Sequence, residues 1–357
     1  MWIQWFDDIG LRDRPSVGGK GASLGELRRA KVAVPPGFVV NTAAFETALA
    51  ALDPDNSIRS QMETLAASHS AAGDPMGSLD LITRVSESIR KRFVAEALPA
   101  TVRDALIEAY EKLAGPDLAV AVRSSATSED SNEASFAGLQ DTLLGVRGAA
   151  AVAQSLCDCW ASLYSRESIS YRLRLKLPER HVAMAVVVQR MIESRSAGVM
   201  FTRSPLTGDR SVIAIEACMG LGSALVSGEV TPDKYVVNKV TGDIAERTVS
   251  AKTLRHVSEP DGGVRIETID GAEELVPALS DTEVRALAEV GKGVERHYGS
   301  PQDIEWAIAP DGSGQQRIYI LQSRPETVWA ARDKEPVATP AARAYDHVLA
   351  ALAGVKR

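Results

Sequence analysis

The chain has 357 residues, of which 45% are hydrophobic and 24% are charged, and its formal net charge is −7. This length predicts two or three domains with a sizeable core and argues against global disorder. The acidic balance and the lack of a basic run argue against a protein devoted to nucleic-acid backbone. No apolar stretch approaches the roughly 18 residues of a membrane span, and the acidic, aromatic start is unlike a secretory signal.

Three cysteines, Cys157, Cys159 and Cys218, are scattered without a CxxC pair. An odd and sparse set is typical of a reducing compartment rather than of a disulfide framework or a zinc site. We expect all three thiols to be buried and inert. Together with the start of the chain, they predict a cytoplasmic protein with neither a membrane nor a nucleic acid as partner.

The first motif along the chain is VGGKGASLGEL, residues 17–27. Two glycines precede Lys20, and a helix is expected from about residue 22 to residue 30. Backbone N–H groups and the positive end of a helix favour a phosphate at such a position. The GxxxxGK[ST] sequence of a P-loop is absent. Taken alone, these residues also fit a turn with a solvated lysine.

Residues 42–113 then show a mainly helical pattern, with Thr42 as the expected N-cap of its first helix.

The segment from Ala121 to Val146 reads AVRSSATSEDSNEASFAGLQDTLLGV. It predicts a strand that ends at Arg123, a small and polar loop, and a second strand at residues 142–146. Such a loop can lay backbone N–H groups over a polyanion while the arginine neutralises charge. A surface hairpin with a long Ser-rich turn explains the same residues, so the segment alone leaves both interpretations open.

A continuous apolar run at residues 182–188 predicts a buried central strand, which Gln189 and Arg190 terminate. Shorter strands are expected after it, and a helix at residues 281–298 should begin at the cap Ser280. The glycine-rich segment 219–233 is by itself only a weak signal of a binding loop.

Two alternating runs around a Gly-rich turn predict a β-hairpin over residues 301–324. Strict alternation puts Ile320, Gln322 and Arg324 on one face of the second strand, beside a strand that carries Glu305. An acid and an amide oxygen are hard ligands suited to Mg²⁺, and an arginine beside them suits a phosphate. An ordinary surface hairpin with a salt bridge is the alternative.

Four segments occur in order: VGGKGASLGEL, AVRSSATSEDSNEASFAGLQDT, QRMIESRSAGVMFT and DIEWAI…IYILQSRPETV. Together they resemble the nucleotide-binding region of the phosphoenolpyruvate synthase and pyruvate phosphate dikinase family, which also occurs in rifampicin phosphotransferase. The resemblance covers about residues 5–329. It implies an α+β, ATP-grasp-like fold with ATP between two lobes and mixed or antiparallel sheets flanked by helices. We expect an N-terminal lobe at residues 1–190, a C-terminal lobe at residues 191–329 and a helical tail at residues 330–357.

The resemblance also implies roles for the charged positions. Lys20 and Arg324 match contacts to the nucleotide phosphates, and Arg123 matches the arginine placed against the transferred phosphoryl groups. These three are therefore the expected catalytic cations. Glu305 and Gln322 match the ligands of Mg²⁺, so that ATP and Mg²⁺ are the expected cofactors.

Four further positions match the family's nucleotide-binding residues. Gly138 and Thr142 match the loop that closes over the phosphates. Gln189, with the backbone toward Met191, matches the strand that lines the adenine pocket.

The family's enzymes continue into a swivelling domain whose histidine, in a Thr-Gly-Gly…Ser-His setting, receives the phosphoryl group. None of the five histidines of this chain has that setting. The expected partner is therefore a phosphohistidine-bearing subunit or domain, and a small-molecule acceptor should bind there. The Met start and the helical character of the last residues favour a subunit of a split enzyme over an excised domain.

A split of this kind is known in phenylphosphate synthase, so the leading expectation is conversion of phenol, ATP and water to phenylphosphate, AMP and phosphate. One alternative is the nucleotide-binding part of a phosphoenolpyruvate synthase or of a rifampicin-type phosphotransferase. A non-catalytic nucleotide sensor or scaffold and a complete small kinase are others. Every candidate phosphate and metal position still holds suitable chemistry, which favours an enzyme over a decayed module.

Overall fold

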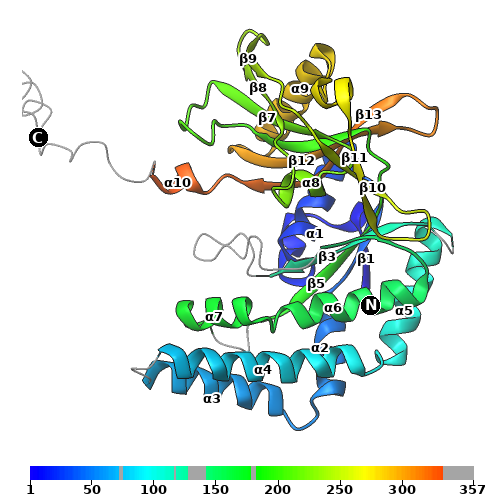
Figure 1. Ribbon diagram of the computed structural model, residues 1–357. Coiled ribbons are helices and arrows are strands. Elements are labelled where there is room, and N and C mark those ends of the chain that lie inside the picture. The colour runs from blue at the N-terminus through cyan, green and yellow to red at the C-terminus, as the bar shows by residue number, and fades with distance from the viewer. Residues whose placement is uncertain (72–74, 116–117, 128–141, 178–181, 333–357) are drawn as a thin grey trace, which may run out of the picture. The chain divides into compact units, whose positions relative to one another are not determined.

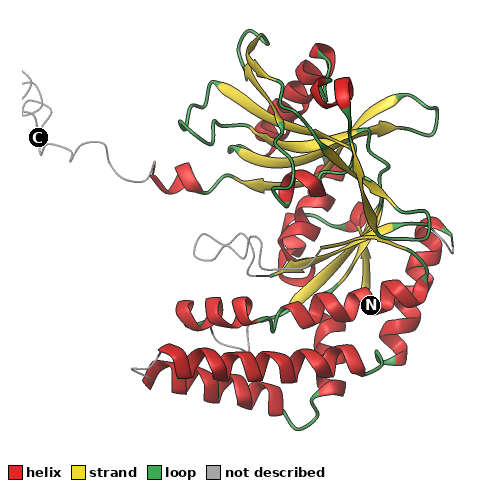
Figure 2. Ribbon diagram, in the orientation of Figure 1, coloured by secondary structure: helices red, strands yellow, loops and turns green. Residues whose placement is uncertain are grey.

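A computed structural model of the chain describes residues 1–71, 75–115, 118–127, 142–177 and 182–332. It is a mixed α+β structure in which antiparallel sheets are flanked by helices (Figures 1 and 2), which confirms the expected fold class. Met1–Pro325 form one compact unit, and Glu326–Arg357 form a second unit whose described part contains α10 (Val328–Arg332). Within the described ranges, no helix is long and apolar enough to cross a membrane.

The first sheet has five antiparallel strands in the order β1-β2-β5-β3-β4. Its strands are β1 (Ile3–Trp5), β2 (Gly37–Val40), β3 (Val120–Ala126), β4 (Thr142–Val146) and β5 (Met184–Arg190). The central strand is β5, where the continuous apolar run predicted a buried strand, and Val186, Val187 and Val188 are fully buried. Such a run is required because both faces of the sheet are covered.

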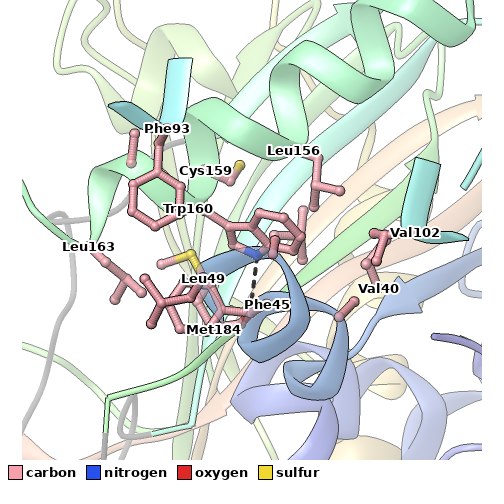
Figure 3. Packing of buried hydrophobic residues seen from close by; sticks show 14 of the residues in the cluster. Val40, Phe45, Leu49, Phe93, Val102, Leu156, Cys159, Trp160, Leu163 and Met184 are labelled. Atoms are coloured by element: carbon pink, nitrogen blue, oxygen red, sulfur yellow. Dashed lines mark hydrogen bonds between the residues drawn. The ribbon is translucent and has the colours of Figure 1, made fainter. Parts of the chain in front are cut away.

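One face of this sheet is covered by a helical layer (Figure 1). The layer consists of α2 (Thr42–Leu52), α3 (Ser57–Ala71), α4 (Pro75–Ala95), α5 (Ala100–Ala114), α6 (Ala149–Ser162) and α7 (Arg166–Leu175). Figure 3 shows Trp160 at its centre, packed edge-on against Phe45 and donating its Nε1 hydrogen to the Met184 carbonyl at 3.2 Å. Truncating a buried tryptophan of this kind to alanine costs about 3–5 kcal/mol.

The layer's first helix begins at Thr42, the residue that the sequence analysis expected to be its cap. Asn41, not Thr42, is the N-cap of α2, because its backbone is extended and its side chain accepts from Ala44 N at 3.2 Å. An asparagine oxygen in this position satisfies one of the unpaired donors of the first turn. The prediction of Thr42 as the cap is therefore wrong by one position.

The other face of the first sheet packs on α1 (Arg14–Arg29), which lies between the two sheets (Figure 1). The helix is kinked at Gly18, whose φ of 71° and ψ of 179° are not helical. Ser125 of β3 fills the kink, since its Oγ donates to Val17 O at 2.8 Å and accepts from Gly21 N at 3.1 Å. A β-carbon at Gly18 would lie 2.1 Å from Ser125 O, so glycine is required there. Lys20 therefore lies two residues after a kink that requires glycine.

The second sheet has six antiparallel strands in the order β13-β12-β6-β7-β8-β9. They are β6 (Ser196–Phe201), β7 (Val212–Met219), β8 (Asp233–Asn238), β9 (Ile244–Thr248), β12 (Gln302–Pro310) and β13 (Gln316–Pro325). The amphipathic α9 (Asp281–Tyr298) packs on it, and its predicted cap Ser280 is confirmed by a reciprocal pair of hydrogen bonds with Glu283. The first sheet ends at Arg190 and the second begins at Ser196, while the expected lobe boundaries stay a prediction.

A two-stranded hairpin, β10 (Leu254–Ser258) and β11 (Val264–Thr268), links the two sheets. At its tip, Gly263 N donates to Gly145 O of β4 at 2.9 Å. In the middle of β10, the His256 carbonyl accepts from Leu221 N at 2.8 Å, next to the short helix α8 (Ser223–Val226). The hairpin therefore joins β4 of the first sheet to the segment that follows β7 of the second.

Candidate functional site

A cavity of about 350 Å³ lies between the two sheets. Its walls come from β3, β4 and the end of β5 on one side, and from β6, α8, β12 and β13 on the other. Most of the lining is apolar, with a few polar side chains among it, as is typical of a small-molecule site. A ligand in this cavity would contact both sheets at once.

Arg123 lines the cavity and connects the two sheets. Its Nη2 donates to Glu305 Oε2 at 2.8 Å and to Gln322 Oε1 at 2.7 Å, and its Nη1 donates to Leu321 O at 2.9 Å. The residue is only 8% exposed. It lies inside β3 rather than at the end of that strand, because β3 continues to Ala126. The predicted cation therefore meets both predicted metal ligands directly.

A β-bulge in β13 decides how the side chains of the β12–β13 hairpin are arranged. Glu305 pairs with Gln322 but Trp306 pairs with Ile320, which leaves Leu321 as an extra residue. Ile320 therefore faces the core with Trp306, and both are fully buried, whereas Gln322 lies beside Glu305. The prediction that Gln322 lies beside Glu305 is confirmed. The prediction that it shares a face with Ile320 is wrong, because the bulge breaks the strict alternation.

The adenine-pocket positions expected from the resemblance also line the cavity. Gln189 is 3% exposed, and its Nε2 donates to Pro35 O at 3.4 Å. Met191 N donates to Ala119 O at 2.9 Å, which holds the chain as it leaves β5. Thr142 is the strand partner of Arg123 and lines the same cavity. Gly138 lies outside the described residues.

Lys20 and Arg324 lie apart from the cavity lining that the described chain provides. Arg324 is the strand partner of Asp303, and the two form an ion pair at 3.4 Å. Lys20 lies on α1 between Gly18, which contacts β3, and Ser23, whose Oγ donates to the Ser323 carbonyl of β13 at 2.7 Å. Both cations therefore lie on elements that adjoin Arg123, and their roles stay predictions.

Residues from the glycine-rich segment 219–233 line the cavity as well, among them Leu221, Ser223 and Ser227. The sequence signal for them was weak, since glycines in a loop mark many kinds of turn. A second contribution, the carbonyl of Leu321, had no sequence signal, because only the bulge in β13 makes it available to Arg123.

The three cysteines are not among the residues that line the cavity. Burial raises the pKa of Cys218 to about 12 and, elsewhere, that of Cys157 to about 11. Cys159 is also buried. Since the reactive form of cysteine is the thiolate, these raised pKa values make Cys157 and Cys218 unreactive at neutral pH. The prediction that all three cysteines are buried is confirmed.

The oxygen atoms beside Arg123 fit a magnesium ion that shares its coordination with a ligand. Within the described ranges, no group of three or more His, Cys, Asp and Glu side chains could hold a metal alone. Glu305 and Gln322 supply two hard oxygen donors, and Mg²⁺ commonly keeps water and phosphate oxygens for its remaining positions. Among the described residues, no acceptor reaches the buried Nε of Arg123, so this cation has a donor left for an anion.

The family model described as pyruvate phosphate dikinase, AMP/ATP-binding domain, matches residues 14–344. This chain belongs to that family. The match covers nearly all of the described residues, including every strand of both sheets and the cavity between them, except for β1 at the start of the chain.

Curated relatives agree with this assignment. The phosphoenolpyruvate synthase of Aeropyrum pernix is 40% identical over 95% of this chain and 44% of its own length. A protein of Methanothermobacter thermautotrophicus named probable phosphoenolpyruvate synthase is 40% identical over 94% of this chain and 47% of its own. Another, from Methanocaldococcus jannaschii, is 38% identical over 94% and 27%. The chain thus spans less than half the length of these relatives.

Proposed function

We propose that this chain binds Mg-ATP and donates a phosphoryl or pyrophosphoryl group in a phosphotransfer of the phosphoenolpyruvate synthase type. The observation that carries the proposal is the Arg123–Glu305–Gln322 cluster, of which Arg123 and Glu305 line the cavity between the two sheets. A buried cation, an acid and an amide oxygen are the groups that a Mg-nucleotide requires. The names of the relatives favour pyruvate over phenol as the final acceptor, so phenylphosphate formation stays a prediction without specific support.

In this function the protein acts by positioning and charge neutralisation. Glu305 and Gln322 would hold Mg²⁺, which supplies charge neutralisation on phosphate oxygens. Arg123 would then donate fewer hydrogen bonds to Glu305 and Gln322, and its N–H groups would point to the group that is transferred. Lys20 and Arg324 would contact the remaining phosphates, and Thr142 would border them.

The acceptor of the transferred group is proposed to be a histidine outside this chain, either in a further part of the same protein or in another subunit. The small molecule that finally receives the group would bind there as well. This arrangement explains a cavity that suits a nucleotide without requiring a second pocket for the acceptor in the same unit.

Labelled nucleotides test the proposal. The chain is incubated with Mg²⁺ and ATP labelled at the β or the γ phosphorus, with and without a phosphohistidine-bearing domain, and the products are separated. Label on the partner, with AMP formed only in its presence, supports the proposal. ADP formed without the partner would instead indicate a complete kinase, and a failure to bind ATP would indicate a scaffold.

A further inference from the structure

A serine and a histidine outside the metal-binding cluster form part of the cavity wall. Ser223 opens α8 and lines the cavity, and its Oγ lies 2.9 Å from Nδ1 of His256 on β10. His256 is 7% exposed, so it contacts solvent little and acts behind the wall rather than within the cavity. None of the roles assigned above uses this pair.

The surroundings of His256 decide which ring nitrogen carries its proton. Nε2 is buried, no described atom completes a hydrogen bond to it, and Glu229 Oε2 lies 3.4 Å away. A hydrogen bond from Ser227, and then the contact with His256, lower the pKa of Glu229, which is therefore ionised at neutral pH. A carboxylate only accepts, so the neutral ring carries its proton on Nε2, toward Glu229. Nδ1 is then left to accept from Ser223.

The backbone around His256 holds this arrangement in place. The His256 carbonyl accepts from Leu221 N at 2.8 Å, and Gly220 forms an isolated parallel β-bridge with His256. Gly220 has a φ of 72°, and a β-carbon there would lie 2.3 Å from the His256 carbonyl oxygen. The close backbone approach therefore fixes the histidine relative to α8, only three residues along the chain from Gly220.

We propose that His256 is a positioning residue that makes the Ser223 hydroxyl a hydrogen-bond acceptor for the bound nucleotide. Because the Ser223 hydroxyl donates to Nδ1, its free lone pair faces the cavity and needs a donor from the ligand. Phosphates offer none at neutral pH, whereas a ribose hydroxyl or an exocyclic amine of the base does. Ser223 therefore contacts the nucleoside part of the ligand, whereas Arg123 contacts the phosphates. This inference rests on the proposed nucleotide binding.

Three single variants and one double variant test this hydrogen bond by calorimetry with Mg-ATP. Ser223→Ala removes the acceptor and should raise the Kd by roughly three- to tenfold, as expected for one hydrogen bond. His256→Gln loses the contact at Nδ1 and should raise the Kd by a similar factor. His256→Asn keeps an amide close to the position of Nδ1 and should restore binding to near the wild-type value. The Ser223→Ala/His256→Gln double variant should be no weaker than either single variant.

Nucleotide analogues separate the two possible donors. If Ser223 accepts from a ribose hydroxyl, Ser223→Ala will have no effect on the Kd of 2′-deoxy-ATP or of 3′-deoxy-ATP. If it accepts from the amine, the effect will vanish with inosine triphosphate, which carries an oxygen in place of the amine. An effect that persists with all three analogues overturns the acceptor role.

The same measurements distinguish this inference from the proposed function. A wild-type chain that fails to bind ATP overturns the proposed function itself. Wild-type binding combined with an unchanged Kd in Ser223→Ala overturns only the role of the Ser223–His256 hydrogen bond, as does a double variant whose effects simply add. If His256→Gln does not fold, the Ser223→Ala and analogue arms still decide, because Ser223 is only half-buried.

Discussion

At the scale of single residues, Arg123 has the largest consequences for this protein. It is nearly buried and donates to an acid, an amide and a carbonyl that all belong to the second sheet. A buried cation of this kind is stable only while its partners compensate its charge. The same cation can therefore hold the sheets together without ligand and neutralise a phosphoryl group when one is bound.

Replacing Arg123 by alanine should abolish labelling of a phosphohistidine partner, by about 10³-fold or more, because charge on the transferred group loses its stabilisation. ATP binding, measured by calorimetry, should persist at a reduced affinity, since the apolar cavity remains. Arg103→Ala is the matched control, because Arg103 is exposed on α5 and forms an ion pair with its neighbour Asp104. Partner labelling at the wild-type rate in Arg123→Ala would exclude this role.

Glu305→Gln keeps the shape of the side chain and removes its charge, so it should weaken metal-dependent binding. We expect the Kd of ATP to rise by roughly tenfold or more when Mg²⁺ is present and to change little in EDTA. Glu289→Gln is the control, since Glu289 lies on the exposed surface of α9 beside Lys292. Equal effects with and without Mg²⁺ would show that Glu305 acts by other means than holding the metal.

At the scale of elements, the kink of α1 and the bulge of β13 place the site. The kink lets Ser125 of β3 pair with the helix backbone, and the bulge brings Gln322 beside Glu305 while Ile320 stays in the core. Each is a local departure from regular geometry that positions side chains of the candidate site. The kink can be tested by stability because a glycine is required at position 18, whereas Gly293 of α9 has room for a β-carbon.

Gly18→Ala should destabilise the protein by about 2–5 kcal/mol, since it combines a strained backbone with an overlap against Ser125. Gly293→Ala on the exposed side of α9 is the matched change, because a β-carbon there meets nothing within 4 Å. It should stabilise by about 0.5–1 kcal/mol. Urea unfolding measures both. If Gly18→Ala does not fold, Ser125→Ala, which removes the partner of the kink, should still cost about 1–3 kcal/mol.

At the scale of the whole molecule, the two sheets form one compact unit over Met1–Pro325. Arg123 bonds across them, α1 packs between them, and the β10–β11 hairpin joins them at a third place. Because the cavity takes its walls from both sheets, a ligand bound there should stabilise both together.

Two buried tryptophans make this coupling measurable. Trp160 reports on the layer of the first sheet and Trp306 on the second sheet. Each is kept in turn as the single fluorescent probe, with the other four tryptophans of the chain replaced by phenylalanine. Within each variant, thermal unfolding followed by fluorescence and by far-UV circular dichroism should give the same midpoint. Mg-ATP at about 100 times its Kd should raise the stability seen by both probes by about 2.7 kcal/mol. A shift at only one tryptophan would mean that the sheets unfold separately and that the ligand binds to one of them.

The sequence alone determined several of the main elements and named the charged candidates for the site. Periodicity located the central strand β5, the capped helix α9 and the β12–β13 hairpin, because these signals depend on neighbours in the chain. The four motifs determined the family and pointed to Lys20, Arg123, Glu305 and Gln322. Composition also predicted buried, unreactive cysteines.

Only the tertiary structure decided which of these residues meet. Arg123 and Gln322 are 199 positions apart in the sequence. Their contact depends on the packing of the two sheets and on a bulge that no local sequence pattern predicts. The same holds for Ser223 and His256, whose hydrogen bond requires the β10–β11 hairpin to fold back on α8. Local propensity acts over a few residues, whereas a binding cavity arises from contacts between distant segments, so its walls could be recognised only after the chain had folded.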